Sequence, residues 1–377
     1  LRRLGEYLSI VPPEMVELHG DMTDWRNSCG TGPYLLTDYV DQSAATFVRN
    51  PNYWRRHPFF GDQMPYLDGV KFLIIPDAST RISALRTAKI NFLTLGWEDA
   101  ADVLKTTPKL NVARLVPTGS SLIFMRTDKP ELPFDDIRVR YALNLGLDNQ
   151  AIVDEYYGGN AVLVVHPITP LPEFECMYTP LEELPEKVQE LYGYNPEKAK
   201  QLLAEAGYPE GFETSIICTE GAVDILSIVK AYWEKIGVIL NMEVKESAVA
   251  SSIGARRSHQ EMIIGAGVDS TPRTWNNFAP DNMGNKSMIN DPRVNEAIAE
   301  WRANQDNWDK LCQIAKDTYP YILEQAWTVP LPAPYGYYLW WPWYKGYNGE
   351  HSIGFYNYYE STHYCWMDLE LKKEMGY

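Results

Sequence analysis

The chain has 377 residues, of which 45% are hydrophobic and 22% are charged. This length exceeds one typical domain, and the composition is that of a folded chain with a sizeable core. No stretch of the sequence approaches the ~18 apolar residues that a membrane-spanning helix needs. The formal net charge of −16 argues against binding to nucleic acid or to an anionic membrane surface.

The cysteines and histidines form no metal-binding motif. The five cysteines include no C-x-x-C pair, which argues against a zinc ribbon or a thioredoxin-like site. Their odd number leaves at least one thiol outside any disulfide within the chain, and the spacing does not decide the pairing. His363 and Cys365 lie two residues apart, but two ligands do not make a metal site. We therefore expect no metal and no cofactor.

The stretch SCGTGPYLLTDYV, residues 28–40, raises the question of a phosphate-binding loop. Its two glycines, Gly30 and Gly32, permit close approach of a ligand to the backbone. However, Pro33 has no N–H to donate, and no Lys-Ser or Lys-Thr pair follows. Residues 34–40 are rich in strand formers. We therefore predict a tight turn that leads into a strand.

Strand-like and helix-like segments then alternate along the chain. Residues 70–76 read as a strand, 79–89 as a helix, and the following segment as a strand that ends at Trp97. This alternation predicts an α/β fold. Further strands are predicted at residues 120–127, 213–219, 238–247 and 261–268, and further helices near residues 136–145, 148–156, 196–206, 222–237, 291–301 and 308–315.

The predicted helix in residues 194–212 carries the clearest boundary signals. Asn195 is expected to cap it, Pro196 to occupy its first position and Gly207 to end it. The helix from residue 148 is predicted to turn Ile152, Val153 and Tyr156 inward. Two segments are expected to lack helices. They are the proline-rich stretch 167–185, predicted as a long surface loop, and the aromatic, proline-containing tail 327–350, predicted as extended.

Five segments in this order resemble the family 5 extracellular solute-binding proteins. These proteins serve ABC importers of dipeptides, oligopeptides, nickel complexes and related solutes. The resemblance runs from about residue 20 to about residue 350. The segments that carry it are GTGPY with RNPNYW, PYLDGVKFLIIPDASTRISAL, PFDDIRVRYALNLGLDNQAIV, YNPEKAKQLLAEAGYPEGF and PWYKGYNGE.

The resemblance implies an α/β fold of the type II periplasmic-binding-protein kind, with two α/β lobes, mixed sheets and a ligand cleft between them. Lobe I is expected to comprise residues 1–119, with its N-terminal part missing, and the return segment 335–377. Lobe II is expected to comprise residues 120–334. Gly119 and Gly336 are candidate hinges, although ordinary loop glycines would read the same way.

The same resemblance implies a function and a location. The chain is expected to capture peptides or a similar small organic solute by lobe closure and to deliver it to the permease subunits of an ABC transporter. It is expected to be a monomer in the periplasm or outside the cell, with a lipid anchor to the membrane left open. Neither the ligand nor the contribution of the missing N-terminal segment to its site follows from the sequence.

The resemblance also implies ligand-binding residues in the segment EMIIGAGVDSTP. Peptide-binding relatives carry there a Trp and then an Asp that pairs with the ammonium group of the peptide. In this chain Ala266 or Gly267, next to Gly265, stands where the Trp is expected. Asp269 is the nearby acid, and a capping role for it is the alternative. This departure from the family pattern puts a peptide ligand in doubt.

Further candidate ligand-binding residues lie outside that segment. Trp275 and Asn276 follow it and would offer stacking and hydrogen bonding. Trp97 and Glu98 are expected at the end of a lobe I strand, where an α/β sheet usually offers its ligand crevice. Simple packing or a solvated loop would account for the same residues.

Two alternatives to a peptide-binding protein stay open. The aromatic content of 13% suits stacking on sugars, so an oligosaccharide-binding protein of the same fold is one alternative. A carbohydrate-active enzyme is the other, but it needs two convergent carboxylates. The pairs Asp135-Asp136 and Glu182-Glu183 are adjacent in sequence and do not converge. No G-x-S-x-G or H-E-x-x-H motif occurs, so we expect no catalytic residues.

Overall fold

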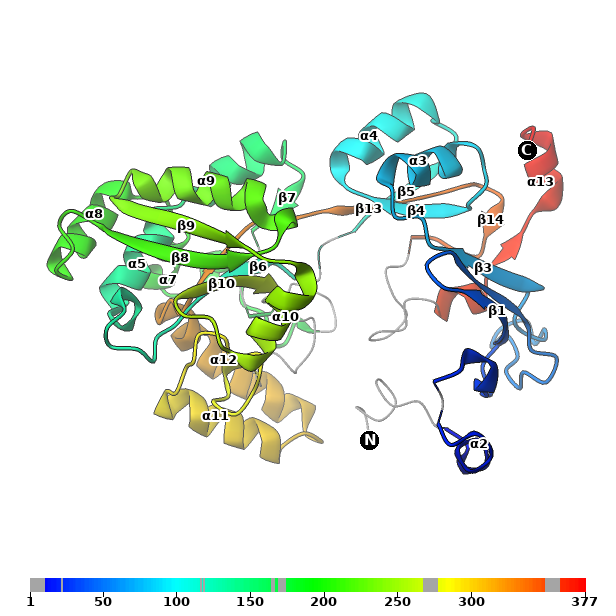
Figure 1. Ribbon diagram of the computed structural model, residues 1–377, viewed down its shortest axis with the longest axis horizontal. Helices are drawn as coiled ribbons and strands as arrows, with labels where there is room; N and C mark the ends of the chain where they lie inside the picture. The colour runs from blue at the N-terminus through cyan, green and yellow to red at the C-terminus, as the bar shows by residue number, and fades with distance from the viewer. Residues whose placement is uncertain are drawn as a thin grey trace. The chain divides into compact units, whose positions relative to one another are not determined.

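The structure is a computed structural model that describes residues 11–21, 23–115, 117, 119–163, 167–168, 174–266, 277–349 and 360–377. Its contacts divide the chain into two compact units (Figure 1). Unit 1 comprises Leu1–Leu115 and Gly336–Tyr377, and unit 2 comprises Val116–Tyr335. Among the helices of the described ranges, none combines the length and the apolar character that crossing a bilayer requires.

Unit 1 contains two three-stranded antiparallel sheets. The first is a meander in the order β1-β2-β3, and the second has the order β4-β13-β5, so that β13 returns from the far end of the chain to pair with both partners. The strands of unit 1 are β1 (Tyr34–Val40), β2 (Ala44–Arg49), β3 (Gly69–Leu73), β4 (Phe92–Leu95), β5 (Asn111–Leu115), β13 (Gly336–Trp340), β14 (Tyr344–Lys345) and β15 (Trp366–Met367).

Two stacked tryptophans fill the centre of unit 1. The rings of Trp341 and Trp343 lie 4.4 Å apart and nearly parallel, and the indole of Trp341 donates to the carbonyl of Leu85. Both side chains are fully buried, so the predicted extended tail forms part of the core. The helices around it are α2 (Pro13–His19), the short turn η1 (Trp25–Asn27), α3 (Ala78–Arg86), α4 (Trp97–Thr106), η8 (Glu360–His363) and α13 (Leu369–Glu374).

One sequence prediction in unit 1 needs correction. Trp97 does not end a strand, because β4 stops at Leu95 and Trp97 begins α4, which buries Ala100 and Val103. The predicted strand at residues 34–40 is confirmed as β1, and a bend at residues 31–33 leads into it. The side chain of Asn50, in the segment RNPNYW, donates to the carbonyl of Gly32 and links this segment to the bend before β1.

The main sheet of unit 2 has five strands in the order β11-β6-β10-β8-β9. Strands β8, β9 and β10 run parallel to one another, whereas β6 is antiparallel to both of its neighbours. The sheet is therefore mixed, as expected. The strands of unit 2 are β6 (Ser121–Met125), β7 (Ala161–Val162), β8 (Phe212–Cys218), β9 (Val238–Val244), β10 (Met262–Ala266), β11 (Thr328–Pro330) and β12 (Ala333–Pro334).

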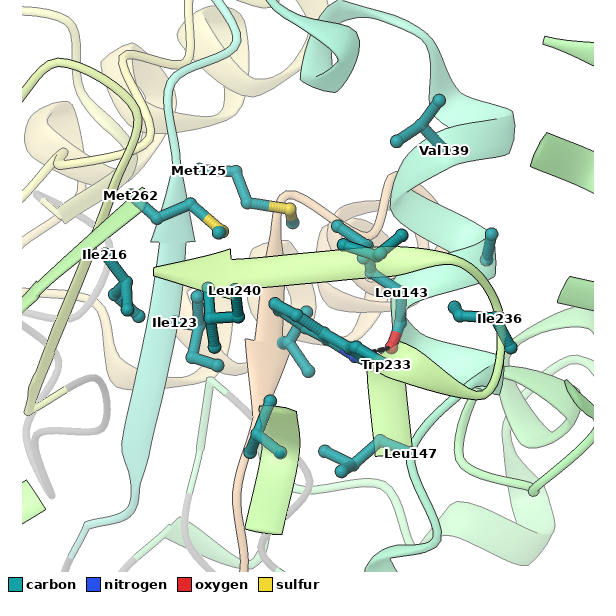
Figure 2. Packing of buried hydrophobic residues seen from close by; sticks show 14 of the residues in the cluster. Ile123, Met125, Val139, Leu143, Leu147, Ile216, Trp233, Ile236, Leu240 and Met262 are labelled. Atoms are coloured by element: carbon teal, nitrogen blue, oxygen red, sulfur yellow. Dashed lines mark hydrogen bonds between the residues drawn. The ribbon is translucent and has the colours of Figure 1, made fainter. Parts of the chain in front are cut away.

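Helices cover both faces of this sheet. The larger core contains Met262 and Trp233, whose indole donates to the carbonyl of Leu143 (Figure 2). The opposite face is a smaller cluster to which Ile263 contributes, covered by α10. Consecutive residues of β10 therefore point into different cores, as the pleat of a strand requires.

The unit 2 helices begin where the capping signals predict. Asn195 accepts a hydrogen bond from the amide of Lys198 at the start of α8, and Asp291 accepts one from Val294 at the start of α11. The helices of unit 2 in the described ranges are η2 (Pro133–Asp135), α5 (Ile137–Leu145), α6 (Asn149–Ala151), the π turn Ile152–Tyr156, η5 (Leu181–Glu183), α7 (Glu186–Leu191), α8 (Pro196–Glu205), η6 (Glu220–Ala222), α9 (Val223–Glu234), α10 (Ser247–Arg256), α11 (Pro292–Ala303) and α12 (Trp308–Glu324).

Two further predictions fail in unit 2. Tyr156 is 39% exposed, because the helix widens into a π turn, which changes the angular position of this residue. The segment 167–185 is not simply a surface loop. Phe174 and Met177 are buried in a cluster with α11 and α12, and Cys176 forms a disulfide with Cys312 of α12.

The Cys176–Cys312 disulfide links the segment after Phe174 covalently to α12. Its two cysteines lie 136 residues apart in sequence, and their Cα atoms are 5.4 Å apart. Of the remaining cysteines, Cys29 is exposed, whereas Cys218 and Cys365 are buried. A structural disulfide persists in oxidising compartments and is rare in the cytosol of mesophiles, which agrees with the location expected from the sequence.

Removing this disulfide should destabilise unit 2. We expect the double substitution Cys176→Ala and Cys312→Ala to lower the free energy of unfolding by about 2–5 kcal/mol, because a large loop is released in the unfolded chain. Urea unfolding followed by tryptophan fluorescence measures this. Cys29→Ala is the control, and a loss below about 0.5 kcal/mol in the double variant would contradict a stabilising role.

Candidate functional site

The carboxyl ends of β8, β9 and β10 meet at one edge of the unit 2 sheet. From β8 the chain passes through α9 to β9, and from β9 it passes through α10 to β10, on the other side of β8. Helices α9 and α10 pack on opposite faces of the sheet (Figure 1). The boundary between β8 and β10 is therefore a topological switch point, the place where open α/β sheets offer a ligand crevice.

Two of the predicted ligand-binding residues lie at this edge. Gly265 pairs with Leu122 and Ala266 pairs with Ser121, and together they end β10. Gly265 is half-buried and Ala266 is exposed. The other predicted residues of this segment fall outside the described residues, namely Gly267, Asp269, Trp275 and Asn276.

Trp97 and Glu98 belong to unit 1, where they form the first turn of α4. Trp97 is half-buried and Glu98 is exposed. A carboxylate in the first turn favours a helix, because it faces the positive end of the helix dipole. Glu98 therefore has a structural role that does not require a ligand.

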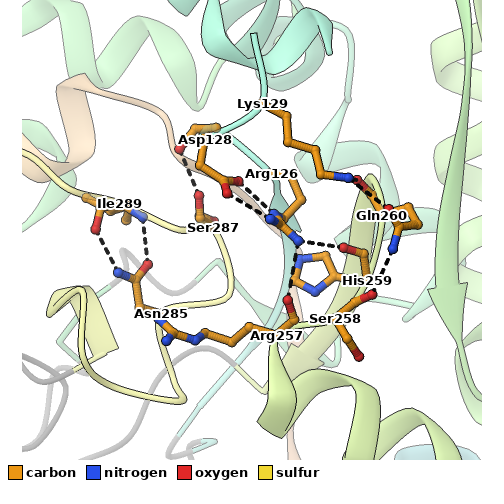
Figure 3. Close-up of polar contacts among 11 residues, drawn as sticks. Arg126, Asp128, Lys129, Arg257, Ser258, His259, Gln260, Asn285, Ser287 and Ile289 are labelled. Atoms are coloured by element: carbon orange, nitrogen blue, oxygen red, sulfur yellow. Dashed lines mark hydrogen bonds and ion pairs between the residues drawn. The ribbon is translucent and has the colours of Figure 1, made fainter. Parts of the chain in front are cut away.

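The segment around Asn285 is an anchored loop that the sequence did not reveal. Asn285 is buried, and its amide group donates to the carbonyl of Ile289 at 2.8 Å and accepts from the amide of Ile289 at 2.8 Å (Figure 3). The hydroxyl of buried Ser287 donates to the carbonyl of Trp327, and the carbonyl of Ser287 accepts from the hydroxyl of Thr127. Buried side-chain hydrogen bonds therefore fix this loop beside the sheet.

The opposite edge of the sheet carries a separate polar cluster (Figure 3). Arg126 donates two hydrogen bonds to Asp128, at 2.6 and 2.7 Å, and a third to the carbonyl of His259. The hydrogen bonds from Arg126 lower the pKa of the Asp128 carboxyl. The charged side chains Arg126 and Lys129 both donate to groups of the protein itself, so these contacts are structural.

His259 is fully buried at the same edge. Burial, reinforced by the positive charge of Arg126, lowers the pKa of its imidazole to about 4. The ring is therefore neutral at physiological pH, and its burial requires no charged ligand as a partner.

One small cavity lies in the described part of unit 2. A cavity of about 20 Å³ in unit 2, large enough for about one water molecule, is lined by residues such as Asn144, Phe278 and Thr328. Phe278 is buried in the cluster with α11 and α12, so it is core rather than an exposed stacking surface. Among the described residues, no group of three or more His, Cys, Asp or Glu side chains could hold a metal ion.

Residues 2–289 match the family described as bacterial extracellular solute-binding proteins, family 5 Middle. This stretch is most of the chain, and the protein belongs to this family. The fold is that of the type II periplasmic binding proteins, as expected. The members to which the chain is similar are binding proteins, and the family is extracellular or periplasmic.

Individual relatives are named for different ligands. The chain is 29% identical over 340 residues to the heme-binding protein A of Haemophilus influenzae. The aligned stretch covers 84% of this chain and 57% of that protein. The chain is 26% identical over 263 residues to the dipeptide-binding protein of Escherichia coli. This alignment covers 68% of this chain and 44% of that protein. The chain thus spans about half the length of these relatives.

A solved structure shares the fold. The periplasmic binding protein DppA from Helicobacter pylori, associated with an ABC transporter and solved in complex with the peptide STSA, superposes with a TM-score of 0.71 at 24% identity. The match covers 90% of this chain and 63% of that one.

The state of His259 predicts a pH dependence of stability. The unfolded imidazole titrates near 6.5 and the folded one near 4, so the unfolded chain binds the proton first as pH falls. Between pH 7 and pH 5 this single group should lower the free energy of unfolding by roughly 2 kcal/mol.

Urea unfolding at both pH values, compared with His259→Leu, measures this contribution. The variant should lose that part of the pH dependence, whereas substitution of the exposed His19 by Leu should retain it. Equal pH dependence in the wild type and His259→Leu would show that the buried ring is not the group responsible.

Proposed function

We propose that the chain is the solute-binding component of an ABC importer and captures a peptide or a similar small organic solute by closure of its two units. The observation that carries this proposal is the family match over residues 2–289. A solute that contacts both units only in the closed form shifts the population toward closure, so binding and closure are coupled. The units Leu1–Leu115 with Gly336–Tyr377 and Val116–Tyr335 would be lobes I and II.

Peptides lead the proposed ligands because two of the relatives above are named or solved with them. Heme is a second candidate, since the relative that covers 84% of the chain is named for heme binding. Capture requires no bond to be made or broken, so the proposal includes no catalytic step. Delivery to permease subunits, a monomeric state, and a location in the periplasm or at the cell surface with a lipid anchor complete the proposal.

Calorimetry of the intact protein tests the ligand class directly. Pools of dipeptides, oligopeptides, cello-oligosaccharides and heme are titrated separately, and we expect heat from a peptide pool. Binding of the oligosaccharide pool alone would replace the proposed ligand class, and hydrolysis of any pool during the titration would contradict a pure binding function.

Asp269 is the proposed partner of a peptide ammonium group. Asp269→Asn removes the charge but keeps the size of the side chain, so we expect the Kd for a binding dipeptide to rise about 10–100-fold, the effect of losing one charged hydrogen bond. Asp281→Asn is the matched control, because Asp281 is an exposed acid of the same unit that pairs with Arg302. Unchanged affinity in Asp269→Asn would refute the ammonium role.

A further inference from the structure

Lys286 extends its side chain through a slot made by two glycines. A Cβ atom on Gly254 of α10 would lie 3.5 Å from Cε of Lys286, and a Cβ atom on Gly265 of β10 would lie only 2.6 Å from its Nζ. Any other residue at position 265 would therefore displace the ammonium group. Since Asn285 and Ser287 are both anchored by buried hydrogen bonds, the backbone on each side of Lys286 is held in place.

Among the residues that the structure describes, the ammonium group at this position pairs with no anion. Its Nζ lies 4.9 Å from the centre of the Phe124 ring, in the cluster between the sheet and α10. Within the described ranges no carboxylate pairs with it, and burial alone lowers its pKa. A charge withdrawn from water costs free energy unless an opposite charge or hydrogen-bond acceptors compensate it, and one aromatic face compensates only part of that cost.

The ammonium group lies at the carboxyl edge of the unit 2 sheet, where two of the predicted ligand-binding residues, Gly265 and Ala266, also lie. Lysine side chains usually carry their charge outward to water along an apolar surface. Here the charge is instead held against Gly265, at the carboxyl end of β10 and beside the switch point between β8 and β10. A cation fixed at that edge suits an anion that arrives with the solute.

We propose that the ammonium group of Lys286 binds a carboxylate of the captured solute. This inference rests on the proposed function and narrows its substrate class to solutes with a free carboxylate, such as peptides with an unmodified C-terminus. Neutral oligosaccharides do not supply such a group.

The test compares one dipeptide, Ala-Phe, with its C-terminal amide, which lacks the carboxylate. The intact wild-type protein, Lys286→Met and the control Lys129→Met are titrated with both compounds by calorimetry. Lys129 is a matched control because it lies at the opposite edge of the same sheet, where it donates to Gln260. Methionine keeps the length and apolar stem of the lysine side chain, and circular dichroism checks that each variant is folded.

We expect the wild type and Lys129→Met to bind the acid at least 10-fold more tightly than the amide, and Lys286→Met to lose that preference. Gly265→Ala should weaken the preference as well, because its methyl group moves the ammonium group away from this position. The substitution does not remove the positive charge of Lys286. This second variant decides the question if Lys286→Met does not fold.

Two results would overturn the inference and leave the proposed function standing. The first is that the wild type binds the acid and the amide with equal affinity. The second is that Lys286→Met still prefers the acid over the amide. If Lys286→Met does not fold, the second result is read from Gly265→Ala instead. A wild-type protein that binds no peptide, with the dipeptide and oligopeptide pools also silent, would instead overturn the proposed function and this inference with it.

Discussion

The register of β10 between β6 and β8 is the constraint on which the rest of unit 2 depends. Because Met262 pairs with Met125 and with Ile216, its side chain joins the large core, and Ile263 is left to the face covered by α10. A slip of one residue would exchange these faces. The same register places Gly265 on the α10 side of the sheet, at its carboxyl edge, where the absence of a side chain opens the slot for Lys286.

The two edges of this sheet have different chemistry. At the amino end of β10, Arg126 is fully used by Asp128 and by backbone carbonyls, and the buried imidazole of His259 is kept neutral. At the carboxyl end, glycine and alanine terminate the strand, and the ammonium group of half-buried Lys286 lacks a carboxylate among the described residues. The Arg126 and Asp128 charges at the first edge pair with each other, whereas the Lys286 charge at the second edge pairs with no described carboxylate. The Cys176–Cys312 disulfide and the core around α12 stabilise the body that carries both.

Features with a local cause could be predicted from the sequence. Asn195 and Asp291 cap helices because their side chains reach backbone amides three residues away. The order of five motifs was sufficient for the family. Trp97 was misplaced because a short apolar run does not show where a strand stops and a helix begins. Tyr156 faces outward because of a π turn that no local pattern signals. Lys286 was missed because its burial depends on glycines from two other elements, which only the fold brings together.

Hydrogen exchange of the intact protein, with and without a saturating peptide, tests most directly whether the solute binds at the carboxyl edge. Solute at that edge should slow exchange in the segments that follow β8 and β10, residues 219–222 and 265–276. Exchange at the amino edge, in residues 126–129 and 257–261, should be unchanged. Slowing confined to the amino edge, or absent from the carboxyl edge at full saturation, would contradict the account.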